Sequence, residues 1–104
     1  MSAAKRRAAY EAAVRGLREV ADKRLSEGAD EESVARELIT LRNSLKAEYR
    51  RYDNRAVVAV MELRNRQKYD NPLGPGPDWL FRKYGSWKDV ISAACRPARL
   101  SRFD

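Results

Sequence analysis

The chain has 104 residues, with 22 Lys and Arg against 15 Asp and Glu, a net charge of +7, one Cys and no His. This length suits one small domain with a single modest core. The absence of His excludes His nucleophiles, His-ligated metals and the commonest general acid or base. The single thiol, Cys95, can form neither an internal disulfide nor a Cys-rich zinc site, so we expect no metal and no cofactor.

Hydropathy argues against a membrane partner. The mean hydropathy is −0.74, and the longest strongly apolar run covers only the six residues 56–61. A membrane-spanning helix needs about 20 apolar residues, and no signal-peptide pattern precedes the first charges. The sequence therefore predicts a soluble protein.

The positive charge is confined to one part of the chain. Residues 1–39 carry eight basic and eight acidic groups, whereas residues 40–104 carry the other 14 basic groups and only 7 acidic ones. We interpret residues 1–104 as a single domain, in which a neutral scaffold precedes a basic functional half. Such a half predicts a polyanionic partner. The alternative is an Arg-rich surface that is merely solvated.

Two amphipathic helices open the chain. Apolar residues recur at intervals of three and four, which places them on one face of each helix. Gly28 should end the first helix, and Asp30 should cap the second. The short link between them predicts an antiparallel helical hairpin. The first apolar stripe is Tyr10, Val14, Leu17, Ala21 and Leu25, and the second is Val34, Leu38, Leu41, Leu45, Tyr49 and Tyr52.

A third helix is expected over residues 55–68, capped by Asp53 or Asn54. The three Val of residues 56–61 would also suit a short buried strand. A helix is favoured because residues 62–68 continue with helix formers and no partner strand is evident.

Residues 70–78 are rich in Pro and Gly and should interrupt regular structure. Two short helices are expected to follow, over residues 79–84 and 87–95. Their terminal signals are Asp78 as the first cap, Gly85 as the first end and Ser86 as the second cap. The chain as a whole is predicted to be all-α, a compact bundle of about five helices.

A basic stripe follows the second helix. Arg42, Lys46 and Arg50 recur every four residues, and Asn43 lies beside them. This spacing presents cations along one line, as contact with a phosphate backbone requires. The alternative is a solvated helix side whose long stems cover apolar edges.

A similar pattern returns later in the chain. Arg64 and Asn65, followed by Lys68, echo Arg42, Asn43 and Lys46, although the spacing differs and the echo can be coincidence. Arg offers a planar fork to phosphate, and Asn offers a donor and an acceptor to a base or ribose. The adjoining Pro-rich loop would position functional groups. The predicted nucleic-acid-binding residues are Arg42, Asn43, Lys46, Arg50, Arg64 and Lys68, and the predicted catalytic residues are Arg64, Asn65, Tyr69, Asp70 and Asn71.

Aromatic residues cluster near the C-terminus. Next to Lys and Arg, such rings can stack on unpaired bases. The favoured interpretation is instead that most of them form the core of the two short helices. The expected core residues are Trp79, Leu80, Tyr84, Trp87, Val90 and Ile91.

Residues 62–96 resemble the C-terminal toxin domains of bacterial polymorphic toxins of the Rhs or contact-dependent inhibition type. The most specific part is Arg64-Asn65 together with Asn-Pro-Leu-Gly-Pro at residues 71–75. The resemblance implies delivery into a neighbouring cell, with action in the cytoplasm of that cell, and a cognate immunity protein, which would be acidic. It also implies a site made of Arg64, Asn65, Lys68, Tyr69 and Asn71, but it supplies no reaction.

Residues 75–94 also resemble, over a shorter stretch, the small helical repeat found beside homing endonucleases. Tyr-Gly-Ser-Trp at residues 84–87 carries this likeness. The likeness implies a role in binding DNA. Only one copy of the repeat is present, where that family usually carries several.

We therefore expect a toxin-type effector domain that acts on nucleic acid, with RNA favoured over DNA, as a metal-independent ribonuclease. The alternative is a non-enzymatic basic helical module that binds DNA, RNA or an acidic protein. The absence of His and of a recognisable acid and base spacing favours the alternative.

Overall fold

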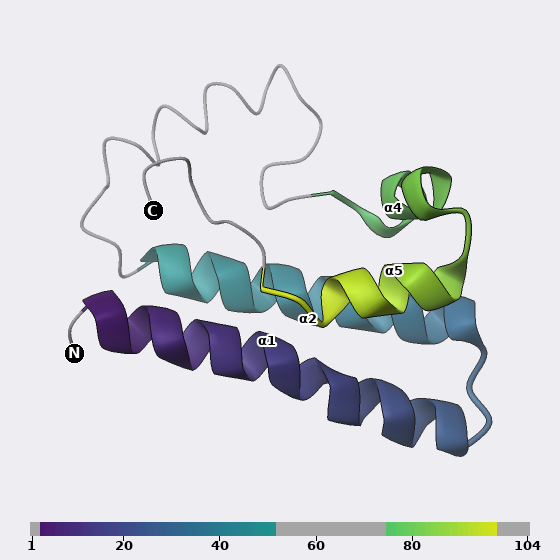
Figure 1. The fold of residues 1–104 in the computed structure, drawn as a ribbon, viewed down its shortest axis with the longest axis horizontal. Helices are drawn as coiled ribbons and strands as arrows, with labels where there is room; N and C mark the ends of the chain where they lie inside the picture. The colour runs from purple at the N-terminus through teal and green to yellow at the C-terminus, as the bar shows by residue number, and fades with distance from the viewer. Residues whose placement is uncertain (1–2, 52–74, 98–104) are drawn as a thin grey trace.

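The computed structural model describes residues 3–51 and 75–97. Four helices lie in these residues, namely α1 (Ala3–Ser26), α2 (Glu31–Arg51), α4 (Pro77–Tyr84) and α5 (Trp87–Ala94) (Figure 1). No strand occurs in the described ranges, and the predicted all-α class is confirmed. The helix expected over residues 55–68 lies outside them.

The first two helices form the expected antiparallel hairpin (Figure 1). Gly28, in the link, has φ +95°, a conformation that glycine adopts at little cost. Asp30 caps α2 as predicted, because its carboxylate accepts hydrogen bonds from the backbone N–H of Ser33 at 3.0 Å and from its hydroxyl at 2.8 Å. These bonds to Ser33 lower the pKa of Asp30. The turn is thus fixed by residues adjacent in sequence.

The C-terminal helices pack against this hairpin. α5 runs along α2 and also contacts α1, where Arg18 Nη2 lies 3.4 Å from Ser92 Oγ (Figure 1). α4 packs mainly on α5. All four helices contribute to one apolar core, made of Tyr10, Val14, Leu17, Ala21, Val34, Ala35, Leu38, Ile39, Tyr49, Leu80, Val90, Ile91, Ala94 and Cys95.

Two terminal signals around α4 and α5 act as predicted. Gly85 follows α4 with φ +83°, and its N–H donates to the carbonyl of Phe81 at 2.7 Å. The Ser86 hydroxyl accepts from the backbone N–H of Asp89 at 3.2 Å and so caps α5.

The prediction that residues 70–78 contain no helix is wrong at its end. α4 begins at Pro77, after Gly76 as the N-cap residue. Pro is tolerated at this position because a first-turn residue needs no N–H donor. Asp78 is therefore not the cap but lies inside the first turn, where its carboxylate accepts a hydrogen bond from Arg36 Nη2 at 2.7 Å.

Leu41 also departs from its expected place. It belongs to the apolar stripe predicted for α2, yet 37% of it is exposed, whereas Leu38 on the same helix is fully buried. The pair offers a matched test of the core, since both residues are Leu and lie one turn apart.

We expect Leu38→Ala to lower the free energy of unfolding by about 2–5 kcal/mol, because it removes buried methyl groups and leaves a cavity. Leu41→Ala should cost about 1 kcal/mol or less, as surface substitutions usually do. Urea unfolding followed by circular dichroism measures both values. Equal losses for the two variants would contradict the packing of α2.

Candidate nucleic-acid interface

Two cations of the predicted basic stripe are enclosed by the fold. Arg42 and Lys46, one turn apart on α2, are only 4% and 7% exposed. The sequence pattern predicted that they would lie along a surface open to phosphate. In this structure their side chains lie inside the domain instead.

Arg42 makes specific contacts inside the domain. Its Nη2 donates to Asn43 Oδ1 at 3.0 Å and to the carbonyl oxygen of Pro75 at 3.1 Å. Its Nε is buried without an acceptor. Burial lowers the pKa of Arg42, because a charged group loses hydration inside a protein. The contact with Pro75 ties α2 to the segment that enters α4.

The structure brings together only part of the predicted site. Asn43 is half-buried beside Arg42. Arg50 lies in the last turn of α2, but its side chain is outside the described part of the chain. The remaining predicted site residues also lie outside it, namely Arg64, Asn65, Lys68, Tyr69, Asp70 and Asn71.

α4 presents an aromatic and cationic surface. Trp79 is 47% exposed and Tyr84 is 37% exposed. The Nζ of Lys83 lies 5.4 Å from the centroid of each of these two rings. Arg82, beside Lys83, is also exposed. We call Trp79, Lys83 and Tyr84 the α4 aromatic cluster.

The exposure of Trp79 and Tyr84 corrects the expectation that they belong to the core. A helix of eight residues buries one narrow stripe, and Leu80 already fills it at 4% exposure. The half-buried rings of Phe81 and Trp87 cover the edge of the core, with centroids 4.4 Å apart. Trp79 and Lys83, four residues apart, then share the outer side of the helix.

Arg36 links α2 to α4. Its Nη2 lies 2.7 Å from the Asp78 carboxylate and 3.4 Å from that of Glu32, and its guanidinium lies 5.2 Å from the centroid of Trp87. The hydrogen bond to Asp78 raises the pKa of Arg36. No sequence pattern could have revealed this bridge, because it joins residues 42 positions apart.

No group of three or more metal-ligating side chains occurs in residues 3–51 and 75–97. Within the same ranges, no helix combines the length and the apolar character that crossing a bilayer requires. Comparison with known proteins gives no family model, curated protein or solved structure that matches this chain.

The Arg42 contact can be tested by its effect on α4. Arg42→Met keeps a long apolar side chain but removes both hydrogen bonds of the guanidinium. We expect faster hydrogen exchange at the α4 amide of Leu80, because Pro75 is then no longer held to α2, and unchanged exchange at Val14 in α1. Exchange measured by NMR checks this. Unchanged protection at Leu80 would show that the Pro75 contact does not hold α4.

Proposed function

We propose that this protein binds nucleic acid that contains unpaired bases, with RNA favoured, through the α4 aromatic cluster. The observation that carries the proposal is the exposure of Trp79 and Tyr84 with the Lys83 ammonium close to both, 5.4 Å from each ring centroid. Trp and Tyr rings are amphipathic and are enriched at binding interfaces. This arrangement supplies aromatic rings that can stack on unpaired bases and a cation that can contact phosphate.

An aromatic ring stacks on any base, and a nearby cation contacts the phosphate that follows it. In a duplex the base faces are covered by their neighbours, so rings on a helix surface cannot reach them. RNA recognition uses single strands and loops for this reason. The α4 aromatic cluster therefore favours an unpaired segment over a duplex.

The surrounding charges support the same partner. The acidic residue in the first turn of α4, Asp78, is already paired with Arg36. Arg82, Lys83 and Lys88 are exposed on α4 and at the start of α5, where Asp89 is the acidic residue of the first turn, so three cations stand against one further carboxylate. The local field is therefore positive, and it would attract a polyanion.

We expect Trp79→Ala to weaken the binding of a single-stranded RNA oligonucleotide about 5- to 150-fold, since stacking contributes about 1–3 kcal/mol per base. Lys83→Gln should weaken binding and reduce the slope of log K against log salt by about 0.7. The matched control is Lys23→Gln, which removes the same charge from the exposed end of α1. Fluorescence anisotropy at several salt concentrations measures these values.

The proposal is contradicted if Trp79→Ala binds as tightly as the unchanged protein, or if duplex and single strand bind equally. If Lys23→Gln weakened RNA binding as much as Lys83→Gln, the affinity would depend only on the total charge of the protein.

We further propose that bound RNA is cleaved, as expected of a toxin-type effector in the cytoplasm of a target cell. The supporting residues are Arg64 and Tyr69, which lie outside the described part of the chain, together with the resemblance to polymorphic toxins. An acidic immunity protein would then cover the same basic surface.

Purified protein incubated with transfer RNA, ribosomal RNA and plasmid DNA, with and without divalent metal, tests cleavage. We expect RNA to be degraded without metal, and Tyr69→Phe to abolish the reaction without weakening the binding due to Trp79. Arg64→Ala should abolish the reaction and also weaken binding, because Arg64 is predicted to contact phosphate as well. Intact RNA in every sample, with binding retained, would overturn the nuclease proposal and leave a non-enzymatic binding module.

A further inference from the structure

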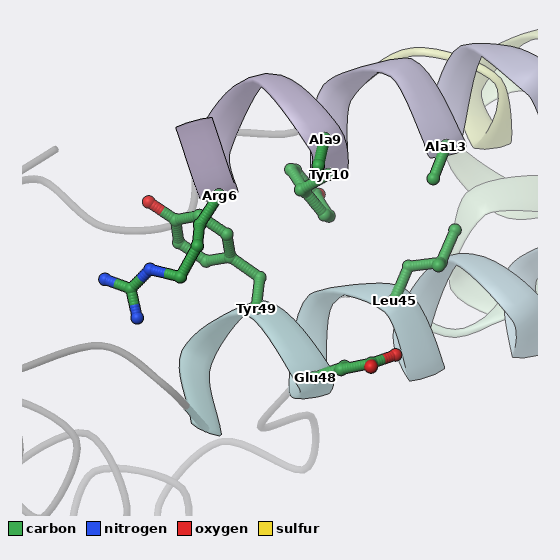
Figure 2. Close-up of a pocket in the computed structure, with 7 residues that line it drawn as sticks. All are labelled: Arg6, Ala9, Tyr10, Ala13, Leu45, Glu48 and Tyr49. Atoms are coloured by element: carbon green, nitrogen blue, oxygen red, sulfur yellow. The ribbon is translucent and has the colours of Figure 1, made fainter. Parts of the chain in front are cut away.

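A pocket lies between the first turns of α1 and the last turns of α2, away from the α4 aromatic cluster. Its volume is about 270 Å³. Figure 2 shows α1 on one side of the pocket and α2 on the other, with side chains from both helices directed into the space between them. The lining residues are Arg6, Ala9, Tyr10, Ala13, Leu45, Glu48 and Tyr49.

The pocket follows from side-chain size. Ala9 and Ala13, four residues apart on α1, face Leu45 and Tyr49 of α2 across the gap. Two methyl groups cannot fill the space that larger apolar residues fill elsewhere in the hairpin. The wall beside them is aromatic, because Tyr10 and Tyr49 are buried with ring centroids 5.4 Å apart. The pocket therefore suits an apolar, planar group.

The charged groups that line the pocket are Arg6 and Glu48, which have opposite charges. Arg6 lines the pocket, has an Nε that is buried without an acceptor, and forms no ion pair with a carboxylate among the described residues. Its neighbour Arg7, by contrast, pairs with Glu11 at 3.2 Å. Figure 2 shows the Arg6 guanidinium and the Glu48 carboxylate extending in opposite directions. One end of the pocket is thus cationic, and an acidic group lies on the α2 side.

We propose that this pocket binds a small aromatic monocarboxylate, with the ring between Ala9, Ala13 and Leu45 and the carboxylate on Arg6. A guanidinium pairs with a carboxylate through charge-assisted hydrogen bonds, which the outer nitrogens of the half-buried Arg6 side chain can donate. The Glu48 charge disfavours a second negative group on the ligand. The volume is slightly below the usual range for drug-sized ligands, which limits the ligand to one or two rings.

This inference does not rest on nucleic-acid binding. The α4 aromatic cluster and the pocket share no residue, so Trp79→Ala should leave the pocket unchanged. A mononucleotide also combines a ring with an anion, but its phosphate carries up to two negative charges and its sugar adds volume. Comparing the binding of indole-3-acetate with that of guanosine 5′-monophosphate therefore distinguishes an aromatic monocarboxylate from a mononucleotide.

The experiment uses NMR titration of the full chain with indole-3-acetate, indole-3-ethanol and guanosine 5′-monophosphate. Saturable shifts are expected at the amides of Ala9, Ala13 and Leu45. Indole-3-acetate should bind at least about tenfold more tightly than uncharged indole-3-ethanol, because only the acid forms the charge-assisted bond to Arg6.

Three variants separate the pocket from general charge effects. Arg6→Gln should remove the preference for the acid over the alcohol, whereas Arg15→Gln, the same change at an exposed position of α1, should keep it. Ala13→Leu should block both indole ligands by filling the pocket, and it keeps a good helix former on α1. Circular dichroism confirms that each variant remains helical.

Several results would overturn the proposal. They are shifts that do not saturate, equal affinity for the acid and the alcohol, or tighter binding of guanosine 5′-monophosphate than of indole-3-acetate. Unchanged binding by a folded Ala13→Leu variant would place the ligand elsewhere on the protein.

Discussion

The packing of α2 against two partners is the constraint on which the rest of this structure depends. α1 and α5 both pack against it, so α2 must bury more than the single stripe that a surface helix buries. One buried set includes Val34, Leu38 and Tyr49. The second set follows the same spacing of three and four residues, and it consists of Ala35, Ile39, Arg42 and Lys46. Two cations are therefore inside the domain because of their place on the helix.

Enclosing a cation is expensive unless it is hydrogen-bonded. For Arg42 the cost is offset in part by Asn43 Oδ1 and by the Pro75 carbonyl. The second of these acceptors belongs to the segment just before α4. The hydrogen bond that stabilises the buried guanidinium therefore also ties the segment leading into α4 to α2. Arg36 adds a second tie between α2 and α4 through Asp78. The surface of α4 is thus positioned by two arginines of α2 that do not themselves belong to it.

The features that the sequence predicted well are those set by neighbouring residues. Asp30, Gly85 and Ser86 act as expected, because caps and helix ends depend on two or three adjacent residues. The helical hairpin and the all-α class follow from periodicity in the same way. What failed was the extent of the covered surface on α2 and the assignment of Trp79 and Tyr84 of α4 to the core. Spacing of four residues describes an exposed stripe and a second buried face equally well, so Arg42 could not be distinguished from a solvated cation.

The aromatic residues of α4 show the same limit in the opposite direction. Trp79 and Tyr84 were expected in the core because apolar rings usually are, yet Leu80 already fills the core beneath α4, and Phe81 and Trp87 pack against it. Whether a ring is buried depends on how much room the other elements leave, and that room is set by contacts distant in sequence. The roles predicted for Tyr69, Asp70 and Asn71 in the Pro-rich loop stay predictions, because these residues lie outside the described part of the chain.

Ion pairing and burial also determine how much of the net charge lies on the surface. Residues 1–39 sum to zero, but their charges are not equivalent, because Arg7, Arg15, Arg24 and Arg36 pair with carboxylates while Arg6 does not pair with one in the described part of the chain. In the basic half, Arg42 and Lys46 contribute to the net charge but are largely enclosed, whereas Lys83 is exposed. The charge that a partner meets is therefore set by pairing and burial. Arg6 pairs with no carboxylate among the described residues and lines a pocket, so it is available to an anionic ligand. The two enclosed cations of the basic half, in contrast, add little to the surface charge.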